Sequence, residues 1–204
     1  MKPSIKDLLP GYKINEYMLV LSPARELWNK IMKVKEEFAD TYQSENARWG
    51  RPYITLATFQ QYAMMEERMI NRLQHIAMGH YPFKVELKDF GSFPSHTIYA
   101  NVTSKVPIQN LVKTIRAEAQ KLMRHDPEIT PHFMLEPHFT IAGKLKPWQY
   151  EKGWLEYSNR HFTGKFIASD MILLKRMEGE RNWREVQRFA FENMPVSTKQ
   201  GELF

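Results

Sequence analysis

Two short segments of the chain repeat one pattern, and this repeat constrains the fold more than any other feature. Residues 51–57 (RPYITLA) are matched by residues 136–142 (EPHFTIA), 85 positions further along (53 against 138). Proline, threonine and alanine coincide, and two apolar positions agree in kind. Such a short match can arise by chance, but each copy opens a predicted strand with a helix before it and another after it. We therefore expect two related lobes that face each other.

Alternating strand and helix signals run along the rest of the chain, and no segment is of low complexity. The apolar periodicities and the proline and glycine breaks predict the following elements. Strands are expected at 16–21, 53–59, 83–90, 97–103, 137–145, 166–176 and 183–191, the last two as an antiparallel pair, and helices at 24–43, 66–79, 107–122 and 147–162. Residues 124–135 are expected to be irregular, and 195–204 to be a frayed polar tail. The pattern predicts an α+β fold over 1–204, a single domain of two lobes, each an antiparallel sheet flanked by helices, with a cleft between them.

Composition narrows the class of protein. The chain has no cysteine, which excludes disulfides, thiol nucleophiles and thiolate metal sites. No apolar run approaches the roughly 20 residues of a membrane span, and the N-terminus reads as no secretory signal, so a cytoplasmic protein without a membrane partner is expected. The net charge of +6 fits either a lysine-rich surface or a cationic patch for phosphate-bearing ligands.

Strand geometry turns the repeat into a candidate site. Side chains alternate between the two faces of a strand, so His138 and Thr140 point one way and Phe139 the other. The same holds for Tyr53 and Thr55 in the first copy. If an approximate two-fold axis relates the lobes, both polar pairs face one cleft. Two hydroxyls and an imidazole could hold a phosphate there, because threonine donates hydrogen bonds and histidine exchanges protons near pH 7.

At these residues the sequence resembles the two-histidine phosphoesterase superfamily, whose members include 2′-5′ RNA ligases and RNA cyclic phosphodiesterases. That family carries one His-x-Thr/Ser motif on a strand of each lobe. His138, Phe139 and Thr140 match the second motif, whereas Tyr53 stands where the first motif has histidine. The order of strands and helices agrees over residues 14–193.

The resemblance implies a substrate and a set of roles. The substrate would be an RNA end or small nucleotide with a 2′,3′-cyclic or 2′-5′ linked phosphate, and no metal or cofactor would be required. His138 would act as general base or acid, and Thr140 and Thr55 would donate to the phosphoryl oxygens. A phenol is a far weaker base than an imidazole at neutral pH. Tyr53 therefore implies either a slow acid-catalysed enzyme or an RNA- or nucleotide-binding protein without turnover, and a scaffold that binds no ligand is a third hypothesis.

Four further side chains are candidates for substrate binding. Phe93 could stack on a base or plug its loop onto the core, and His96 could reach the cleft or lie on the surface. Lys144 falls on the face of His138 and Thr140 by even spacing, although a solvated lysine at a strand end is common. Arg176 or its neighbour Lys175 must face outward or into the groove. The remaining histidines have no metal-binding spacing, and no nucleotide-binding or serine-hydrolase motif occurs, nor is a protein partner inferred.

Overall fold

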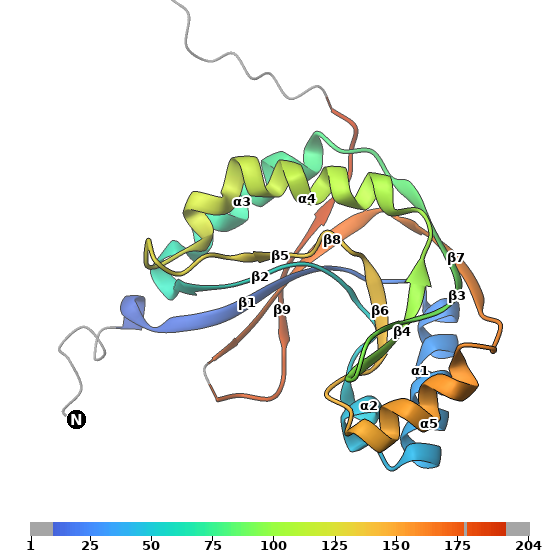
Figure 1. The fold of residues 1–204 in the computed structure, drawn as a ribbon. Helices are drawn as coiled ribbons and strands as arrows, with labels where there is room; N and C mark the ends of the chain where they lie inside the picture. Colours follow the sequence, from blue (N-terminus) through green and yellow to red (C-terminus); the bar gives the residue numbers. More distant parts are fainter. Residues whose placement is uncertain (1–9, 178, 195–204) are drawn as a thin grey trace, which may run out of the picture.

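The computed structural model describes residues 10–177 and 179–194, so the predicted tail 195–204 lies outside it. Strands and helices alternate along the described chain (Figure 1). The strands are β1 (Ile14–Leu21), β2 (Ile54–Tyr62), β3 (Phe83–Phe93), β4 (Thr97–Val102), β5 (His132–Phe133), β6 (His138–Ala142), β7 (Thr163–Ala168), β8 (Asp170–Met177) and β9 (Arg184–Ala190). The helices are α1 (Arg25–Tyr42), α2 (Glu45–Trp49), α3 (Glu66–Met78), α4 (Lys105–Ala119) and α5 (Pro147–Tyr157), with 3₁₀ turns η2 (Pro10–Tyr12), η3 (Ala63–Met65) and η4 (Gln120–Met123).

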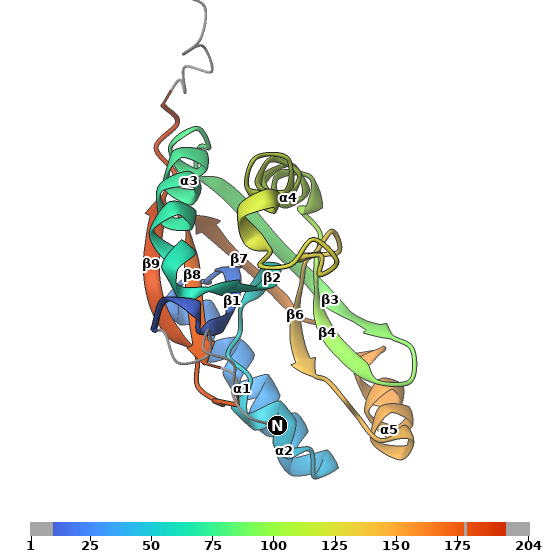
Figure 2. The same cartoon turned by 90° about the vertical axis from the view of Figure 1, so that its left-hand side faces the viewer.

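Two antiparallel sheets form the centre of the molecule, which confirms the predicted α+β architecture. The larger sheet has the strand order β5-β2-β1-β8-β9, and the smaller has the order β6-β4-β3-β7. Figure 2 separates them, with β8 and β9 on one side and β3, β4 and β6 on the other. The two copies of the sequence repeat lie in different sheets, because β2 carries the first and β6 the second.

Helices cover the outer faces of the two sheets. Helix α1 packs against β6 and β7 of the smaller sheet, and α5 packs against β4, whereas α3 packs against β9 of the larger sheet. Helix α4 lies beside α3 and contacts β2. The apolar side of α1, which includes Leu27, Ile31, Val34 and Phe38, is buried in a core shared by both sheets. Among the described residues no helix is long and apolar enough to cross a bilayer.

The structure corrects several predicted boundaries. The strand expected at 166–176 is two strands, because the chain crosses between sheets at Ser169: β7 pairs with β3, and β8 pairs with β1. The predicted antiparallel pairing of the last strands is confirmed for β8 and β9. Helix α5 ends at Tyr157 rather than 162, and Ser158 and Asn159 bind the carbonyl of Leu155 with their side chains. The segment 124–135, expected to be irregular, contains the short strand β5. Helix α2 was not predicted.

A β-bulge interrupts β2 and β6 at the same place in each sequence repeat. In the β1–β2 pair, Leu19 faces Ala57 and Val20 faces Thr55, so Leu56 is the extra residue. In the β4–β6 pair, Tyr99 faces Thr140 and Ile98 faces Ala142, so Ile141 is extra. A bulge bends its strand and re-aims the neighbouring side chains. The repeat therefore encodes a local backbone shape as well as a side-chain pattern.

Candidate functional site

A pocket of about 530 Å³ opens between the two sheets, and both copies of the repeat contribute to it. Its volume is in the range of small-molecule sites. Its walls come from β1, α1, the α2–β2 segment, β6 and the turn after it, β8 and the β8–β9 connection. The lining residues are Met18, Lys35, Asn46, Trp49, Gly50, Arg51, Tyr53, Thr55, Thr140, Gly143, Lys144, Arg176, Arg181, Asn182 and Trp183.

The two predicted threonines meet in this pocket from opposite sheets. Thr55 comes from β2 and Thr140 from β6, each directly before its bulge. The Thr140 side chain is exposed, and the Thr55 hydroxyl makes only a weak contact with Sδ of Met18, at 3.8 Å. Neither hydroxyl is held by a strong hydrogen bond within the described part of the protein, so both can donate to an anion.

Tyr53 also lines the pocket, directly before β2 begins. Its ring meets that of Trp28 edge-on, with centroids 5.4 Å apart. The same ring packs against an apolar cluster of Val20, Ile172 and Leu174 on the larger sheet. These contacts hold the phenol at one side of the pocket, where it can serve as a hydrogen-bond donor.

The charge of the lining is entirely positive. Five lining residues are basic and none is acidic. Arg176 pairs with Glu16 at 2.5 Å and lies over the Trp183 ring, 4.5 Å from its centroid. Its neighbour Lys175 instead pairs with Glu66 at 2.7 Å, so Arg176 is the member of the predicted pair that reaches the pocket. An all-cationic lining favours an anionic ligand.

Lys144 reaches the pocket by a route that the sequence pattern did not predict. Strand β6 ends at Ala142, so the alternation used to place Lys144 has already stopped. Lys144 instead has a φ of 54°, a left-handed conformation that is uncommon outside glycine and asparagine. This turn brings its side chain to the same pocket as Thr140.

His138 does not belong to the pocket lining, in contrast to the expected convergence with Tyr53. Its ring packs against Phe93 and Tyr99, with centroids 5.0 and 4.9 Å away, on the β6 face that also carries Thr140. Nδ1 lies 2.7 Å from the carbonyl oxygen of Glu136. A carbonyl can only accept, so Nδ1 carries the proton and Nε2 has the free lone pair.

The electrostatic surroundings of His138 favour the neutral ring. Burial lowers the pKa of His138 below the usual histidine range, and the carbonyl and carboxylate of Glu136 act in the opposite direction. At pH 7 the imidazole is therefore neutral with Nε2 unprotonated. This is the form that a general base requires.

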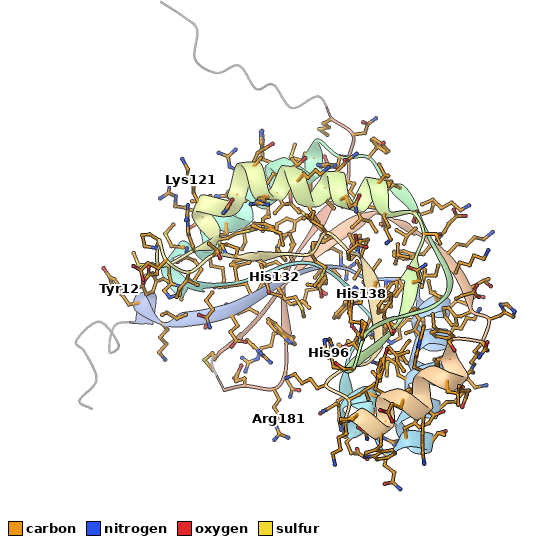
Figure 3. All side chains as sticks on the ribbon, viewed as in Figure 1. Tyr12, His96, Lys121, His132, His138 and Arg181 are labelled. Atoms are coloured by element: carbon orange, nitrogen blue, oxygen red, sulfur yellow. The ribbon has the colours of Figure 1, made fainter. Side chains whose placement is uncertain are left out.

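Phe93 and His96 also lie outside the lining. Phe93 packs against Tyr99, with centroids 4.8 Å apart, as well as against His138. His96 is exposed in the turn between β3 and β4, and its Nδ1 lies 2.7 Å from the hydroxyl of Thr97. Figure 3 places His96 and His138 on the side of β4 and β6, and Arg181 on the connection between β8 and β9.

Several residues that line the pocket were not predicted from the sequence. Trp49 and Arg51 flank the end of α2, a helix that was not predicted, and Arg181 and Trp183 lie before β9. Trp49 is strongly exposed (77 %), as expected for an aromatic side chain available to a ligand. Lys35 occupies a buried position of α1. Its only sequence signal was a lysine between the apolar positions Val34 and Phe38.

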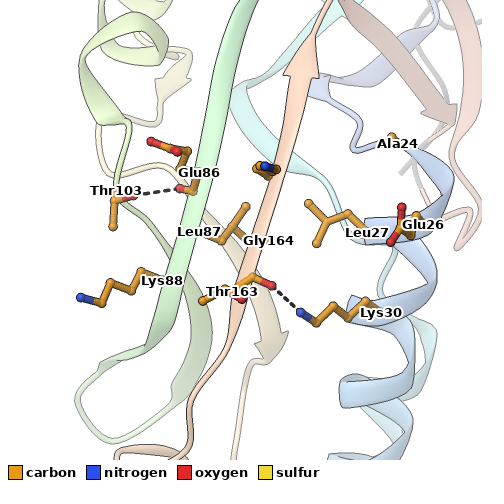
Figure 4. A pocket seen from close by; sticks show the side chains of 11 residues that line it. Ala24, Glu26, Leu27, Lys30, Glu86, Leu87, Lys88, Thr103, Thr163 and Gly164 are labelled. Carbon is orange, nitrogen blue, oxygen red and sulfur yellow. Dashed lines mark hydrogen bonds between the residues drawn. The ribbon is translucent and has the colours of Figure 1, made fainter.

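A second pocket, of about 700 Å³, lies between β3, β7 and the start of α1 (Figure 4). Its charges are mixed, with Glu26 and Glu86 beside three lysines. Lys30 donates to the carbonyl of Thr163. Neither copy of the repeat contributes to this pocket. Although it is larger and also contains two threonines, its two carboxylates distinguish it from the pocket between the sheets, whose lining has none.

Comparison with known families fits this geometry. A sequence model described as the 2′-5′ RNA ligase superfamily matches residues 23–180. The chain belongs to this superfamily. A search of curated proteins finds no match.

Solved structures similar to this member of the 2′-5′ RNA ligase superfamily cover most of the chain. The structure of Escherichia coli LigT complexed with 3′-AMP has a TM-score of 0.59 and 14% identity, and covers 88% of this chain and 99% of its own. LigT complexed with NADP+ has a TM-score of 0.58 and 15% identity, with the same coverage. The protein TT0787 of Thermus thermophilus has a TM-score of 0.55 and 16% identity, and covers 87% and 98%. These similarities establish a common fold.

Proposed function

We propose that this protein binds and cleaves a 2′,3′-cyclic or 2′-5′ linked phosphodiester at an RNA end or in a small nucleotide. The observation that carries the proposal is the meeting of Thr55 and Thr140, from opposite sheets, in a pocket with five cations and no carboxylate among its lining residues. The match to the 2′-5′ RNA ligase superfamily and the 3′-AMP bound by LigT support the same substrate class.

In the proposed reaction the two hydroxyls hold the non-bridging phosphoryl oxygens, and Lys144 and Arg176 offset the charge that develops on them. A water molecule attacks phosphorus and forms the new P–O bond, while its proton passes to Nε2 of His138. The bond from phosphorus to one ribose oxygen breaks. That oxygen takes the phenolic proton of Tyr53, and the product is a phosphate monoester. His138 then releases its proton to solvent and Tyr53 regains one, which restores the site.

For this step Nε2 of His138 has to reach the pocket. Its ring lies against Phe93 and Tyr99, outside the pocket lining, and its Nδ1 is bound to the Glu136 carbonyl. Rotation about the Cα–Cβ and Cβ–Cγ bonds is the smallest change that can bring the ring from its contacts with Phe93 and Tyr99 into the pocket. Substrate binding would have to favour the rotated state.

The position of His138 also favours a second candidate function, a non-catalytic protein that binds RNA ends or nucleotides through the same pocket. In that case Tyr53 and the cations provide affinity, and His138 remains packed in its aromatic cluster. The two candidates share a ligand and differ in turnover.

Hydrolysis of nucleoside 2′,3′-cyclic phosphates separates these functions. The native protein, His138→Ala, Tyr53→Phe and Tyr53→His are compared at equal concentration. An enzyme that uses Tyr53 as acid loses activity by about 10²- to 10⁴-fold in both His138→Ala and Tyr53→Phe. Binding without turnover in the native protein, with activity gained in Tyr53→His, would establish the binding function. Equal rates in the native protein and Tyr53→Phe would refute the assigned role of Tyr53.

A further inference from the structure

Lys35 is a buried lysine that nevertheless lines the pocket between the sheets. Its side chain is only 2 % exposed, on the face of α1 that packs against β6. No carboxylate among the described residues forms an ion pair with it. A buried ammonium without a counter-charge is costly, so such a residue calls for a compensating partner.

Two backbone carbonyls provide part of that compensation. The Lys35 ammonium donates to the oxygens of Thr140, at 3.0 Å, and Ile141, at 2.9 Å. Ile141 is the bulged residue of β6, so its backbone lies outside the regular ladder with β4. Lys35 therefore fixes the strand at the point where Thr140 turns into the pocket. An ammonium has three N–H donors, and these two carbonyls use two of them.

Gly50 leaves space for the Lys35 ammonium because it has no side chain. A Cβ atom at position 50 would lie 3.2 Å from Nζ of Lys35, closer than an ordinary contact. Gly50 lines the same pocket, directly after α2. The absence of a side chain there leaves the ammonium next to the pocket.

The charged groups on the elements around α1 do not neutralise Lys35. On α2, Arg48 pairs with Asp40 of α1 and lies 3.9 Å from Glu45. On α5, Glu156 accepts a hydrogen bond from Tyr42. Arg160, after α5, pairs with Glu37 of α1.

The other neighbours of Lys35 add positive or no charge. On β6, His138 is neutral at pH 7, and Lys165 of β7 lines the second pocket. The other titratable groups that line the pocket between the sheets are the basic Arg51, Lys144, Arg176 and Arg181 and the phenol of Tyr53.

We propose that Lys35 is the buried cation of a phosphate site, which positions Thr140 through the β6 bulge and takes the bound phosphate as its missing counter-charge. The inference rests on the proposed function only in the class of ligand, a nucleotide phosphate. Burial lowers the pKa of Lys35 to about 8. A phosphate dianion beside it favours the charged form, so anion binding and protonation of Lys35 strengthen each other.

Binding of 3′-AMP between pH 7 and 9 tests this inference by calorimetry, because the phosphate of the probe is already a dianion over that range. Lys35→Met removes the charge at similar length, and Lys33→Met makes the same change at an exposed position of the same helix. The native protein and Lys33→Met are expected to bind more weakly as the pH rises through 8. Lys35→Met is expected to bind about 10- to 100-fold more weakly at pH 7 and to lose that pH dependence.

A second test measures the protons that the native protein takes up when it binds 3′-AMP, and it needs no variant. At pH 8, about half of the free native protein has a neutral Lys35, so 3′-AMP binding should take up about half a proton per site. Calorimetry in two buffers of different ionisation enthalpy measures this uptake. Binding without uptake, or equal binding by Lys35→Met, overturns the inference and leaves the proposed function standing. Failure of the native protein to bind either 3′-AMP or inorganic phosphate overturns both.

Discussion

Leu56 and Ile141 are structural equivalents, because each is the extra residue of a β-bulge and each follows a threonine that lines the pocket. Their carbonyls are satisfied differently. The Leu56 oxygen accepts from the backbone N–H of Met134, at 2.9 Å, and the Ile141 oxygen accepts from the ammonium of Lys35, also at 2.9 Å. The two copies of the repeat therefore share a backbone shape. They differ in that the buried ammonium of Lys35 contacts the backbone of the second copy, at Thr140 and Ile141.

Removal of either pocket hydroxyl should weaken anion binding. Thr55→Val and Thr140→Val are each expected to lower the affinity for 3′-AMP by about tenfold or more, because a hydrogen bond to a charged group is lost without a change in side-chain shape. Thr163→Val, in the second pocket, provides the matched control on an exposed strand threonine. Calorimetric titration measures all three. A loss of affinity in Thr163→Val alone would place the ligand in the second pocket.

The lowered pKa of His138 predicts a dependence of stability on pH. The folded state holds the ring with a pKa below that of the unfolded chain, near 6.5, so the unfolded state binds more protons as the pH falls below that value. The contribution of neutral His138 is complete above pH 6.5 and is lost progressively on acidification. Urea unfolding of the native protein and His138→Gln between pH 5 and 7.5 measures it.

His80 has a pKa lowered by burial as well, so the comparison with His138→Gln is needed to isolate one ring. We expect the stability of the native protein to fall relative to His138→Gln as the pH drops from 7 to 5. Parallel pH profiles for the two proteins would mean that His138 is not desolvated in solution.

The two antiparallel sheets, and the position of Thr55 and Thr140 in one pocket, could be predicted from the sequence, because both depend on local periodicity. Strand alternation alone places Thr55 and Thr140 on inner faces, and the repeat places them in opposite sheets. The crossing at Ser169 could not be predicted, since β7 and β8 form one continuous run whose division depends on partners far away in sequence.

The rest of the site depends on tertiary contacts that a sequence pattern does not contain. The ring of His138 lies outside the pocket lining and packs against Phe93 and Tyr99, which belong to the neighbouring hairpin of β3 and β4. In the sequence, Lys35 is indistinguishable from an ordinary lysine of an amphipathic helix. Its acceptors are the carbonyls of Thr140 and Ile141 at the β6 bulge, which only the folded structure brings next to it. Lys144 lines the pocket, but its left-handed backbone, not the strand alternation used to predict its position, places it there.

The buried Lys35 should also change how the unfolding free energy of the free protein depends on pH. Its folded pKa of about 8 lies below the ordinary value of 10.5, so between these values the unfolded chain binds more protons. Stability is therefore expected to rise with pH above 8, by as much as about 1.4 kcal/mol per pH unit relative to Lys35→Met. Chemical unfolding at pH 7, 8, 9 and 9.5 measures the difference.

The same unfolding measurements in saturating phosphate provide a control for the predicted rise of stability with pH. Because the anion keeps Lys35 protonated, the rise should begin at a higher pH when the site is occupied. The Lys33→Met variant should follow the native curve in both conditions. A native curve that is flat between pH 8 and 9.5 relative to Lys35→Met would contradict the burial of an uncompensated charge at this position.

Gly91 keeps the aromatic cluster around His138 in place. It faces Tyr99 in the β3–β4 ladder, and a Cβ atom there would lie 2.5 Å from Cε2 and 2.6 Å from Cζ of the Tyr99 ring. Gly91→Ala must displace that ring, so we expect a loss of about 1–3 kcal/mol in unfolding free energy. The same change in a Tyr99→Ala background removes the clash and should cost nothing. Urea unfolding of the four proteins gives the coupling energy.

The matched control is Gly143→Ala, where the nearest atom to the added Cβ is Cγ2 of Thr140, at an ordinary 3.6 Å. It should change the unfolding free energy by much less than Gly91→Ala. Since Tyr99 also packs against the His138 ring, the displaced tyrosine should shift the imidazole resonances of His138 in NMR spectra of Gly91→Ala. Strict additivity of the Gly91 and Tyr99 changes would show that the ring and the glycine do not meet, and would remove the reason for a glycine at this point of β3.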